Sequence, residues 1–168
     1  MTISNIMQKM IEYSNGNLHD INHFIKVWAY AKTIAEGANE GVNVRLNSDT
    51  LFILEVAAIT HDIACPLCRE KYGNTNGKYQ EIEGEILVRE FLKDCDLTSE
   101  QTERVAHLVA HHHTFKDIDG IDYQILIEAD YIVNAEECNY SKDNIKNFSE
   151  KFFKTTTGIN LLKSIYGL

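Results

Sequence analysis

The chain contains few residues that interrupt a helix: of its 168 residues, one is proline and nine are glycine. Proline inside a helix removes a backbone hydrogen bond and clashes with the preceding turn, and glycine there costs backbone entropy. Their scarcity permits long helices over nearly the whole chain. Strict alternation of apolar and polar residues, which is typical of half-buried strands, is also lacking, and apolar residues recur with the period of a helix.

Positive charge is scarce as well. The chain has 16 Lys and Arg residues and 25 Asp and Glu residues, which gives a net charge of -9 at pH 7. A general nucleic-acid binder needs a basic surface to displace the counterions of the phosphates. We therefore expect no general nucleic-acid binding, whereas a small phosphorylated ligand held by a local metal ion is compatible with this charge.

Long apolar runs are lacking too, and no continuous one approaches the ~20 residues that span a membrane. Residues 1–5 show no charged segment followed by an apolar one, as a signal peptide would. We therefore expect a cytoplasmic protein that does not contact membranes. In that compartment the cysteines are expected to be reduced; they are Cys65, Cys68, Cys95 and Cys138.

Hydrophobic residues make up 44% of the chain, enough for a sizeable core. The pattern predicts one all-α domain over residues 1–168, a compact bundle of six or more helices. Asn47, Ser48 or Asp49 can begin one helix, and Thr98 with Gln101 forms a capping-box pattern. Helices are predicted over residues 3–14, from residue 20 to near 37–41, and from residues 47–49 to about residue 60. Further helices are predicted over 80–93, 98–113, 121–137 and 141–155, and a short helical turn follows the last of them.

Two details of this prediction concern the middle of the chain. Residues 64–77 contain the proline, two glycines and several polar residues, so they are predicted to be an irregular loop beside the candidate site, where substrate would bind. The helix over 80–93 is predicted to turn its larger apolar side chains inward, namely Ile82, Ile86, Leu87, Phe91 and Leu92.

The most informative residues are polar side chains inside apolar helical runs. His61 and Asp62 follow an apolar run, His23 lies one turn into a long helix, and Asp130 stands in the middle of another. Each alone has a simpler explanation, such as a solvated helix end or a hydrogen-bonded core histidine. Together they supply two imidazoles and two carboxylates from three helices, a ligand set that suits Mn, Fe, Co, Ni or Zn better than Ca. Mg is kept as a further possible ion.

The order and flanking residues of this set resemble the HD-domain superfamily of metal-dependent phosphohydrolases. The matching segments are Asp20-Ile21-Asn22-His23, Ala57-Ala58-Ile59-Thr60-His61-Asp62-Ile63 and Ala129-Asp130-Tyr131-Ile132. The resemblance covers residues 18–137, and residues 141–168 are expected to pack on this core. It implies a divalent metal held by His23, His61, Asp62 and Asp130, and hydrolysis of a small phosphorylated substrate, often a nucleotide.

The implied chemistry assigns catalytic roles to Asp62 and His112. A metal ion supplies positive charge to the phosphoryl group and acidifies a water molecule, and Asp62 is the candidate to guide that water's proton. One ion is expected, and a second ion is possible. Its candidate ligands are Glu83, His111 and His112; of the run His111-His112-His113, His112 is favoured as the inward residue, and the outer ones are expected to be solvated.

The chain departs from the family after Asp62. Many members continue with a glycine and a lysine, where this chain has Ala64 and Cys65. The missing lysine would contact phosphate, so that contact is absent or comes from a nearby basic residue. The candidates are Arg69, Lys71 and Lys78.

Other readings stay open. An HD-like site can also bind a nucleotide or a metal without turnover, which would make the protein a non-catalytic sensor module. The spacing Cys65-Pro66-Leu67-Cys68 suits a redox or zinc motif, although no strand–helix pattern accompanies it. An oxygenase-type use of two metals lacks a clear second-metal histidine in residues 80–93. A homodimer is possible, and the sequence leaves the oligomeric state open.

Overall fold

The computed structural model describes residues 2–38 and 46–168, and these residues form nine helices and no strand. The predicted all-α fold with six or more helices is therefore confirmed for this part of the chain. The predicted end of the second helix, near 37–41, lies partly outside the described residues. The helices are α1 (Ile3–Tyr13), α2 (Leu18–Ala38), α3 (Ser48–Thr60), α4 (Cys65–Tyr72), α5 (Gly77–Leu92), α6 (Ser99–Val109), α7 (Ile121–Glu137), α8 (Lys142–Phe152) and α9 (Thr156–Tyr166).

Local caps explain where several helices begin. The side chain of Asn47 accepts a hydrogen bond from the backbone of Thr50 and starts α3. Thr98 and Gln101 form the predicted capping box of α6, in which each side chain binds the other's backbone N–H. Such caps satisfy backbone donors that have no partner within the first turn of a helix. These helix starts are thus specified by residues close in sequence.

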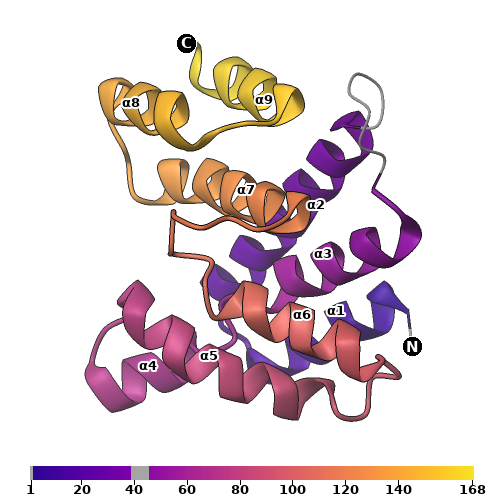
Figure 1. Cartoon of the computed structure of the whole chain (residues 1–168). Helices are drawn as coiled ribbons and strands as arrows, with labels where there is room; N and C mark the ends of the chain where they lie inside the picture. Colours follow the sequence, from indigo (N-terminus) through magenta and orange to yellow (C-terminus); the bar gives the residue numbers. More distant parts are fainter. Residues whose placement is uncertain (1, 39–45) are drawn as a thin grey trace.

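Helix α3 forms the centre of the molecule, between α2, α6 and α7 (Figure 1). All its residues from Ile53 to Thr60 are buried. A helix that is buried on every side leads directly to His61, which is itself fully buried. The fold thereby carries His61 into the interior and leaves Asp62, whose side chain is 22% exposed, at the edge of that interior.

The stretch Ser48–Tyr72 is apolar and long enough to cross a membrane by length and composition alone, contrary to the expectation that no such stretch exists. Of its most apolar window, 72% is buried inside the fold. This stretch consists of the central helix α3 followed by α4. Its apolar character is accounted for by burial in the protein core.

The predicted loop over residues 64–77 is wrong in its first half, because residues Cys65–Tyr72 form helix α4. Pro66 lies in the first turn of this helix, where proline costs little because its missing N–H would have no partner. Gly73 ends the helix in the left-handed conformation, with φ of 70°. The irregular segment is therefore shorter and lies between α4 and α5.

The predicted inward face of α5 is also partly wrong. Ile82 and Ile86 are 52% and 66% exposed. The buried row of α5 runs through Gly84, Val88 and Phe91, and residues two positions from this row point about 200° away from it. The large apolar side chains of α5 were expected to face the core, but packing against α6 determines which row of α5 is buried.

The C-terminal segment after α7 forms two full helices, so the predicted final helical turn is in fact the 11-residue helix α9. Glu128 of α7 is fully buried and accepts hydrogen bonds from the backbone N–H groups of Lys154 and Thr155, at 2.7 and 3.0 Å. Its carboxylate thereby attaches the link between α8 and α9 to α7. Figure 1 shows both helices stacked on α7.

Candidate metal centre

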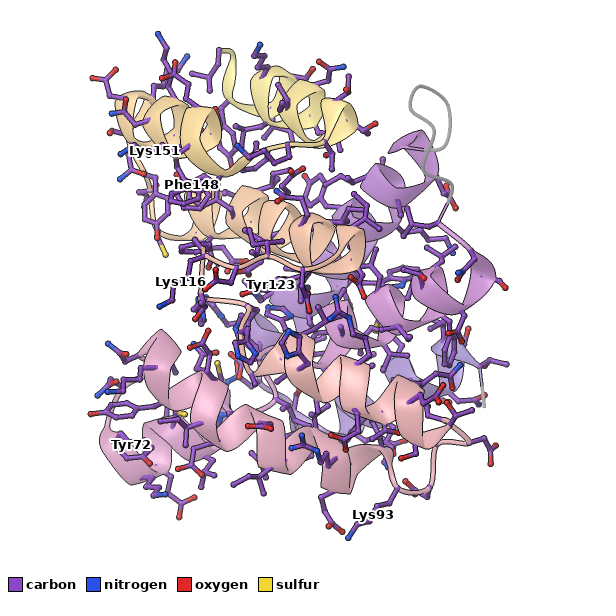
Figure 2. All side chains as sticks on the ribbon, in the orientation of Figure 1. Tyr72, Lys93, Lys116, Tyr123, Phe148 and Lys151 are labelled. Carbon is purple, nitrogen blue, oxygen red and sulfur yellow. The ribbon has the colours of Figure 1, made fainter. Side chains whose placement is uncertain are left out.

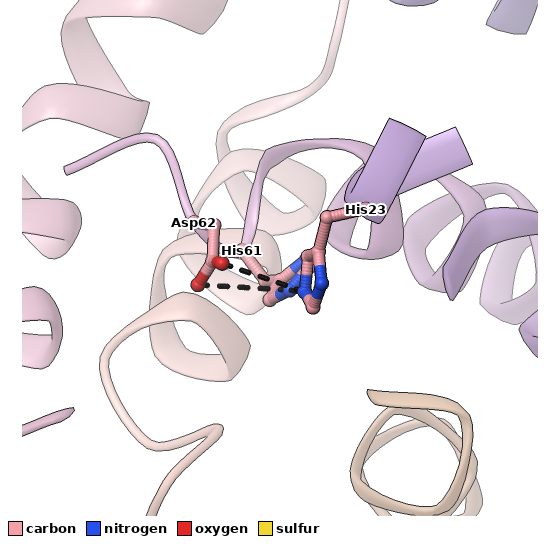
Figure 3. A group of neighbouring side chains, drawn as sticks. All are labelled: His23, His61 and Asp62. Carbon is pink, nitrogen blue, oxygen red and sulfur yellow. Dashed lines mark hydrogen bonds and ion pairs between the residues drawn. The ribbon is translucent and has the colours of Figure 1, made fainter. Parts of the chain in front are cut away.

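Three helices bring the four predicted metal ligands together. His23 comes from α2, His61 and Asp62 follow α3, and Asp130 comes from the middle of α7. The Nε2 atom of His23 lies 3.1 Å from Nε2 of His61 and 3.2 Å from Oδ1 of Asp130. Asp62 Oδ2 lies 3.4 Å from His23 Nε2, and Figure 3 shows this carboxylate facing both rings. The other three side chains thus lie within 3.4 Å of His23 Nε2, and His61 and Asp62 form with His23 a group whose possible ligand atoms all lie within 4.8 Å of one another.

The other ring nitrogen of each histidine is already occupied. His61 Nδ1 lies 2.9 Å from the carbonyl oxygen of Ala58, and His23 Nδ1 lies 2.8 Å from Oε2 of Glu137. A nitrogen that donates to an oxygen carries the proton of a neutral ring, so the lone pair is left on Nε2. Two lone pairs and two carboxylates then face one another. Such a group requires positive charge, and a divalent cation fits it.

Glu137 was missed in the sequence. It lies seven residues after Asp130, which places both carboxylates on the same face of α7 two turns apart. This spacing is the signal that could have identified it. Its role is to orient the His23 ring through Nδ1, as the second layer of a metal site often does.

His112 completes the centre from the turn after α6. It is fully buried, and its Nδ1 lies 2.7 Å from the carbonyl oxygen of Val109. Among the described residues its Nε2 has no hydrogen-bond partner, and it lies 3.3 Å from Oδ1 of Asp62. The prediction that His112 is the inward histidine therefore agrees with its placement.

His113 was expected to be solvated, and this expectation is wrong. Its Nε2 is buried and has no hydrogen-bond partner in the described part of the chain. Asp62, His112 and His113 form a second group of possible ligands whose atoms lie within 4.8 Å of one another. Helix α6 ends at Val109 and these histidines lie in a turn, so neighbouring side chains are not held about 100° apart as they would be on a helix.

Two predicted second-metal ligands lie elsewhere. His111 Nδ1 is directed to the carbonyl oxygen of His107, at 2.7 Å. Glu83 Oε1 binds Nζ of Lys71 at 2.6 Å and the hydroxyl of Tyr72. Neither belongs to the groups of possible metal ligands found among the described residues.

The pKa values of the residues in this centre indicate that it stabilises positive charge. Burial lowers the pKa of His23, but Asp130, Asp62 and Glu137 outweigh it and raise this pKa to about 10. Burial likewise lowers the pKa of His112, and Asp62 again reverses the effect, so its pKa is raised. Burial raises the pKa of Asp62 and Asp130, yet the surrounding histidines hold both well below the usual range. The residues therefore fit a divalent cation, which would replace protons on these rings.

A cavity of about 590 Å³ opens at this centre. The residues that line it include His23 and Asp62 from the metal centre, and Tyr131 of α7 and Phe148 of α8. The rings of Tyr131 and Phe148 are stacked, with centroids 3.7 Å apart. Figure 2 shows Phe148 on the side of α8 that faces α7. The cavity thus joins a carboxylate–imidazole group to an aromatic wall.

Of the three basic residues expected to contact phosphate, only Arg69 lines this cavity, and it forms an ion pair with Asp20 there. Lys71 is paired with Glu83 between α4 and α5. Lys78 is exposed on α5 and is not part of the cavity wall. The structure therefore brings one predicted phosphate contact to the centre and leaves two outside it.

The cysteine motif lies on α4. Cys65 lines the cavity, and its Sγ lies 3.3 Å from Oε1 of Gln80. Burial and the nearby Asp62 raise the pKa of the Cys65 thiol far above its usual value, which keeps it protonated. Cys68 is fully buried, and burial raises its pKa too. No group of possible metal ligands in the described residues includes a cysteine, so neither the zinc nor the redox reading gains support.

The family model of the HD domain matches residues 20–138, which include all four predicted ligands. The chain therefore belongs to the HD-domain family, an all-α family that binds divalent metals and whose members are generally hydrolases, some of them non-catalytic. Comparison with the curated proteins and with the solved structures gave no match. In the described part of the chain, the His23–His61–Asp62 group and the Asp62–His112–His113 group could each hold a metal ion.

Proposed function

We propose that the protein is a metal-dependent phosphohydrolase that acts on a small phosphorylated substrate, most naturally a nucleotide or a related phosphate ester or anhydride. The observation that carries the proposal is the set of three inward Nε2 atoms, from His23, His61 and His112, facing Asp62 at the base of a cavity. Imidazole nitrogens with carboxylates are suitable ligands for Mn, Fe, Co, Ni or Zn, and Mg is also compatible.

His23, His61, Asp62 and Asp130 would hold one ion, and Asp62 with His112 and His113 would hold a second. A divalent ion at this position supplies positive charge to a phosphoryl group and lowers the pKa of a water molecule. Asp62 belongs to both groups, so it is the residue on which the proposal depends most. Its Oδ1 lies 3.3 Å from His112 Nε2. With one ion bound, Asp62 would guide the proton of the attacking water, and His112 Nε2 would be free to protonate the leaving oxygen. With a second ion bound, His112 Nε2 would be a ligand instead.

The rest of the cavity supports a substrate with a flat organic group. Phe148 and Tyr140 present aromatic surface, and Asn134 and Asn144 present amide groups that can bind the edge of a ring. A cavity of about 590 Å³ has room for a molecule of nucleotide size. Arg69 is the candidate phosphate contact, provided that its guanidinium turns from Asp20 to the substrate. Lys71 and Lys78, outside the cavity, are weaker candidates.

The second candidate function is a sensor module that binds a nucleotide or metal without hydrolysis. The observation in its favour is that, among the described residues, no lysine lines the cavity and only Arg69 supplies a permanent positive charge to its wall. Under both candidates we expect a cytoplasmic protein with a small-molecule ligand, without nucleic-acid or membrane partners.

Metal content and phosphate release, measured together, test the proposal. The protein is purified, loaded in turn with Mn, Co, Ni, Zn and Mg, and assayed against a panel of nucleotides and simple phosphate esters. We expect phosphate release with at least one metal, and loss of both bound metal and activity in Asp62→Ala. His111→Gln is the matched control, since His111 lies outside the ligand groups. Unchanged metal content in Asp62→Ala would contradict the assignment, and tight nucleotide binding without release under any metal would favour the sensor.

A further inference from the structure

Helix α5 carries a regular exposed row that the metal centre does not use. Lys78, Ile82, Ile86 and Glu90 follow one another at intervals of four residues, and all four are exposed. Side chains at this spacing form one ridge along a helix. Ile82 and Ile86 are among the most exposed large apolar side chains of the described chain, at 52% and 66%. The ridge therefore has an apolar middle, a positive beginning and a negative end.

The helix cannot rotate to bury this ridge, because its opposite face is closely packed. A Cβ added at Gly84 would lie 2.8 Å from Cγ1 of Val109, which shows how closely α5 approaches α6. Glu81 Oε1 accepts hydrogen bonds from the backbone of His113 and the hydroxyl of Thr114, at 3.1 and 2.9 Å. These contacts fix the orientation of α5 in the monomer. Its apolar ridge remains exposed to solvent, and Figure 1 shows α5 along the lower edge of the molecule.

We propose that this ridge of α5 is the docking surface for a second copy of the chain. Two copies of α5 would pack antiparallel about a twofold axis that crosses the ridge between Ile82 and Ile86. Lys78 of one copy then faces Glu90 of the other, and Ile82 of one copy faces Ile86 of the other. Each of these contacts occurs twice because of the twofold symmetry. An interface about a twofold axis must be self-complementary in this way.

The charge pattern favours this occupant over others. The ridge carries one positive and one negative end, so it is neutral as a whole and attracts its own antiparallel copy. An anionic membrane surface would favour a cluster of basic residues, which is not present on this ridge. Glu90 also has Lys93 as an ion-pair partner on its own helix, with both side chains 69% exposed. Exposed pairs of this kind are weak and exchange readily.

The geometry also predicts a weak dimer. Ridges of residues four apart pack with their helices crossing at about 50°. A helix of 16 residues is about 24 Å long, so the contact covers less than the ~800 Å² per partner of a standard stable interface. We expect a dissociation constant between roughly 10 µM and 1 mM, with the monomer dominant in dilute solution.

Sedimentation analysis of the full chain over roughly 10 µM to 1 mM tests the proposal. The 19.2 kDa chain is expected to shift towards twice its mass as concentration rises. Ile86→Glu should remain monomeric. Lys78→Glu and Glu90→Lys should each weaken dimerisation about tenfold, because each change affects both symmetric ion pairs. An equimolar mixture of these two variants should dimerise again, since every ridge contact then joins opposite charges.

The matched control is Ile165→Glu, which changes an isoleucine of α9 that is 42% exposed and lies away from α5. It should dimerise like the wild type. Far-UV circular dichroism checks that each variant is folded. A wild-type chain that stays monomeric at the highest concentration overturns the proposal. So does a dimer that is unaffected by Ile86→Glu, or a mixture of the two charge variants that dimerises no better than either alone.

Discussion

Nε2 of His23 and Nε2 of His61 lie 3.1 Å apart, while the Nδ1 atom of each ring is hydrogen-bonded to an oxygen. Two nitrogen lone pairs at this distance repel unless a proton or a cation lies between them. The carboxylates of Asp62 and Asp130, at 3.4 and 3.2 Å from His23 Nε2, increase the demand for positive charge. The behaviour of the protein towards metals should follow from this contact.

Metal addition should therefore stabilise the fold. At a free metal concentration 100 times Kd, binding adds about 2.7 kcal/mol to the free energy of unfolding, which raises Tm by about 5–10 °C for a domain of this size. Thermal unfolding with chelator and with each divalent metal measures this shift. His23→Gln should abolish most of it, and His111→Gln should retain it. An equal shift in His23→Gln would exclude the centre as the metal site.

The aromatic wall should determine substrate affinity. Phe148→Ala removes the ring stacked on Tyr131 and should raise KM about tenfold with a smaller change in kcat. Phe152→Ala is the matched control, since Phe152 contacts Phe148 but does not line the cavity of the metal centre. Steady-state kinetics on the substrate found by the phosphatase panel give both constants. Equal effects of the two variants would mean that Phe148 acts only through packing.

Tyr123 should hold the turn that carries His112. Its hydroxyl hydrogen is shared between the carbonyl oxygens of His111 and Thr114, on either side of His112. Tyr123→Phe should lower the free energy of unfolding by about 1–3 kcal/mol and weaken metal binding. Tyr166→Phe is the control, because its hydroxyl donates to the carbonyl oxygen of Ile132 instead. Metal titration, measured by calorimetry, should give a lower affinity for Tyr123→Phe than for Tyr166→Phe. Equal affinities of the two variants would show that Tyr123 does not position His112.

Alkaline pH should destabilise the protein through tyrosines whose pKa is raised in the folded state. Burial raises the pKa of Tyr123, Tyr131 and Tyr166 to about 12, compared with about 10 in an unfolded chain. Between these values the unfolded state loses protons that the folded state retains, so the free energy of unfolding falls as pH rises. Urea unfolding at pH 9 to 11.5 measures the fall. As pH rises, tyrosinate absorbance of the folded protein should include a step well above pH 10. Titration of all tyrosines near pH 10 in the folded protein would contradict this prediction.

Glu128 should anchor the C-terminal helices. Glu128→Ala leaves the N–H groups of Lys154 and Thr155 and the hydroxyl of Thr155 without their acceptor. We expect a loss of about 3 kcal/mol in the free energy of unfolding, measured by urea denaturation. Glu136→Ala, which removes a carboxylate with 68% exposure from the same helix, should cost less than about 0.5 kcal/mol. Similar losses would show that the buried acceptor is dispensable.

Features that depend on neighbours in sequence could be predicted from the chain alone. The bounds of α7, Ile121–Glu137, agree with the prediction, because an apolar helical run follows a turn and no breaker interrupts it. His23, His61, Asp62 and Asp130 stood out because a polar side chain in an apolar run is costly unless it has a partner. The structure brings these four residues together, and the family match covers them.

Features that depend on contacts between distant segments required the tertiary structure. Glu83 meets Lys71 instead of the metal centre, and Arg69 meets Asp20, because α4 lies against both α5 and the beginning of α2. His113 turns inward because the chain leaves the helical path after Val109. The sequence by itself thus determined which side chains needed a partner. The packing of helices decided which partner each one met, since a period of 3.6 residues defines the faces of a helix but not which of them is covered.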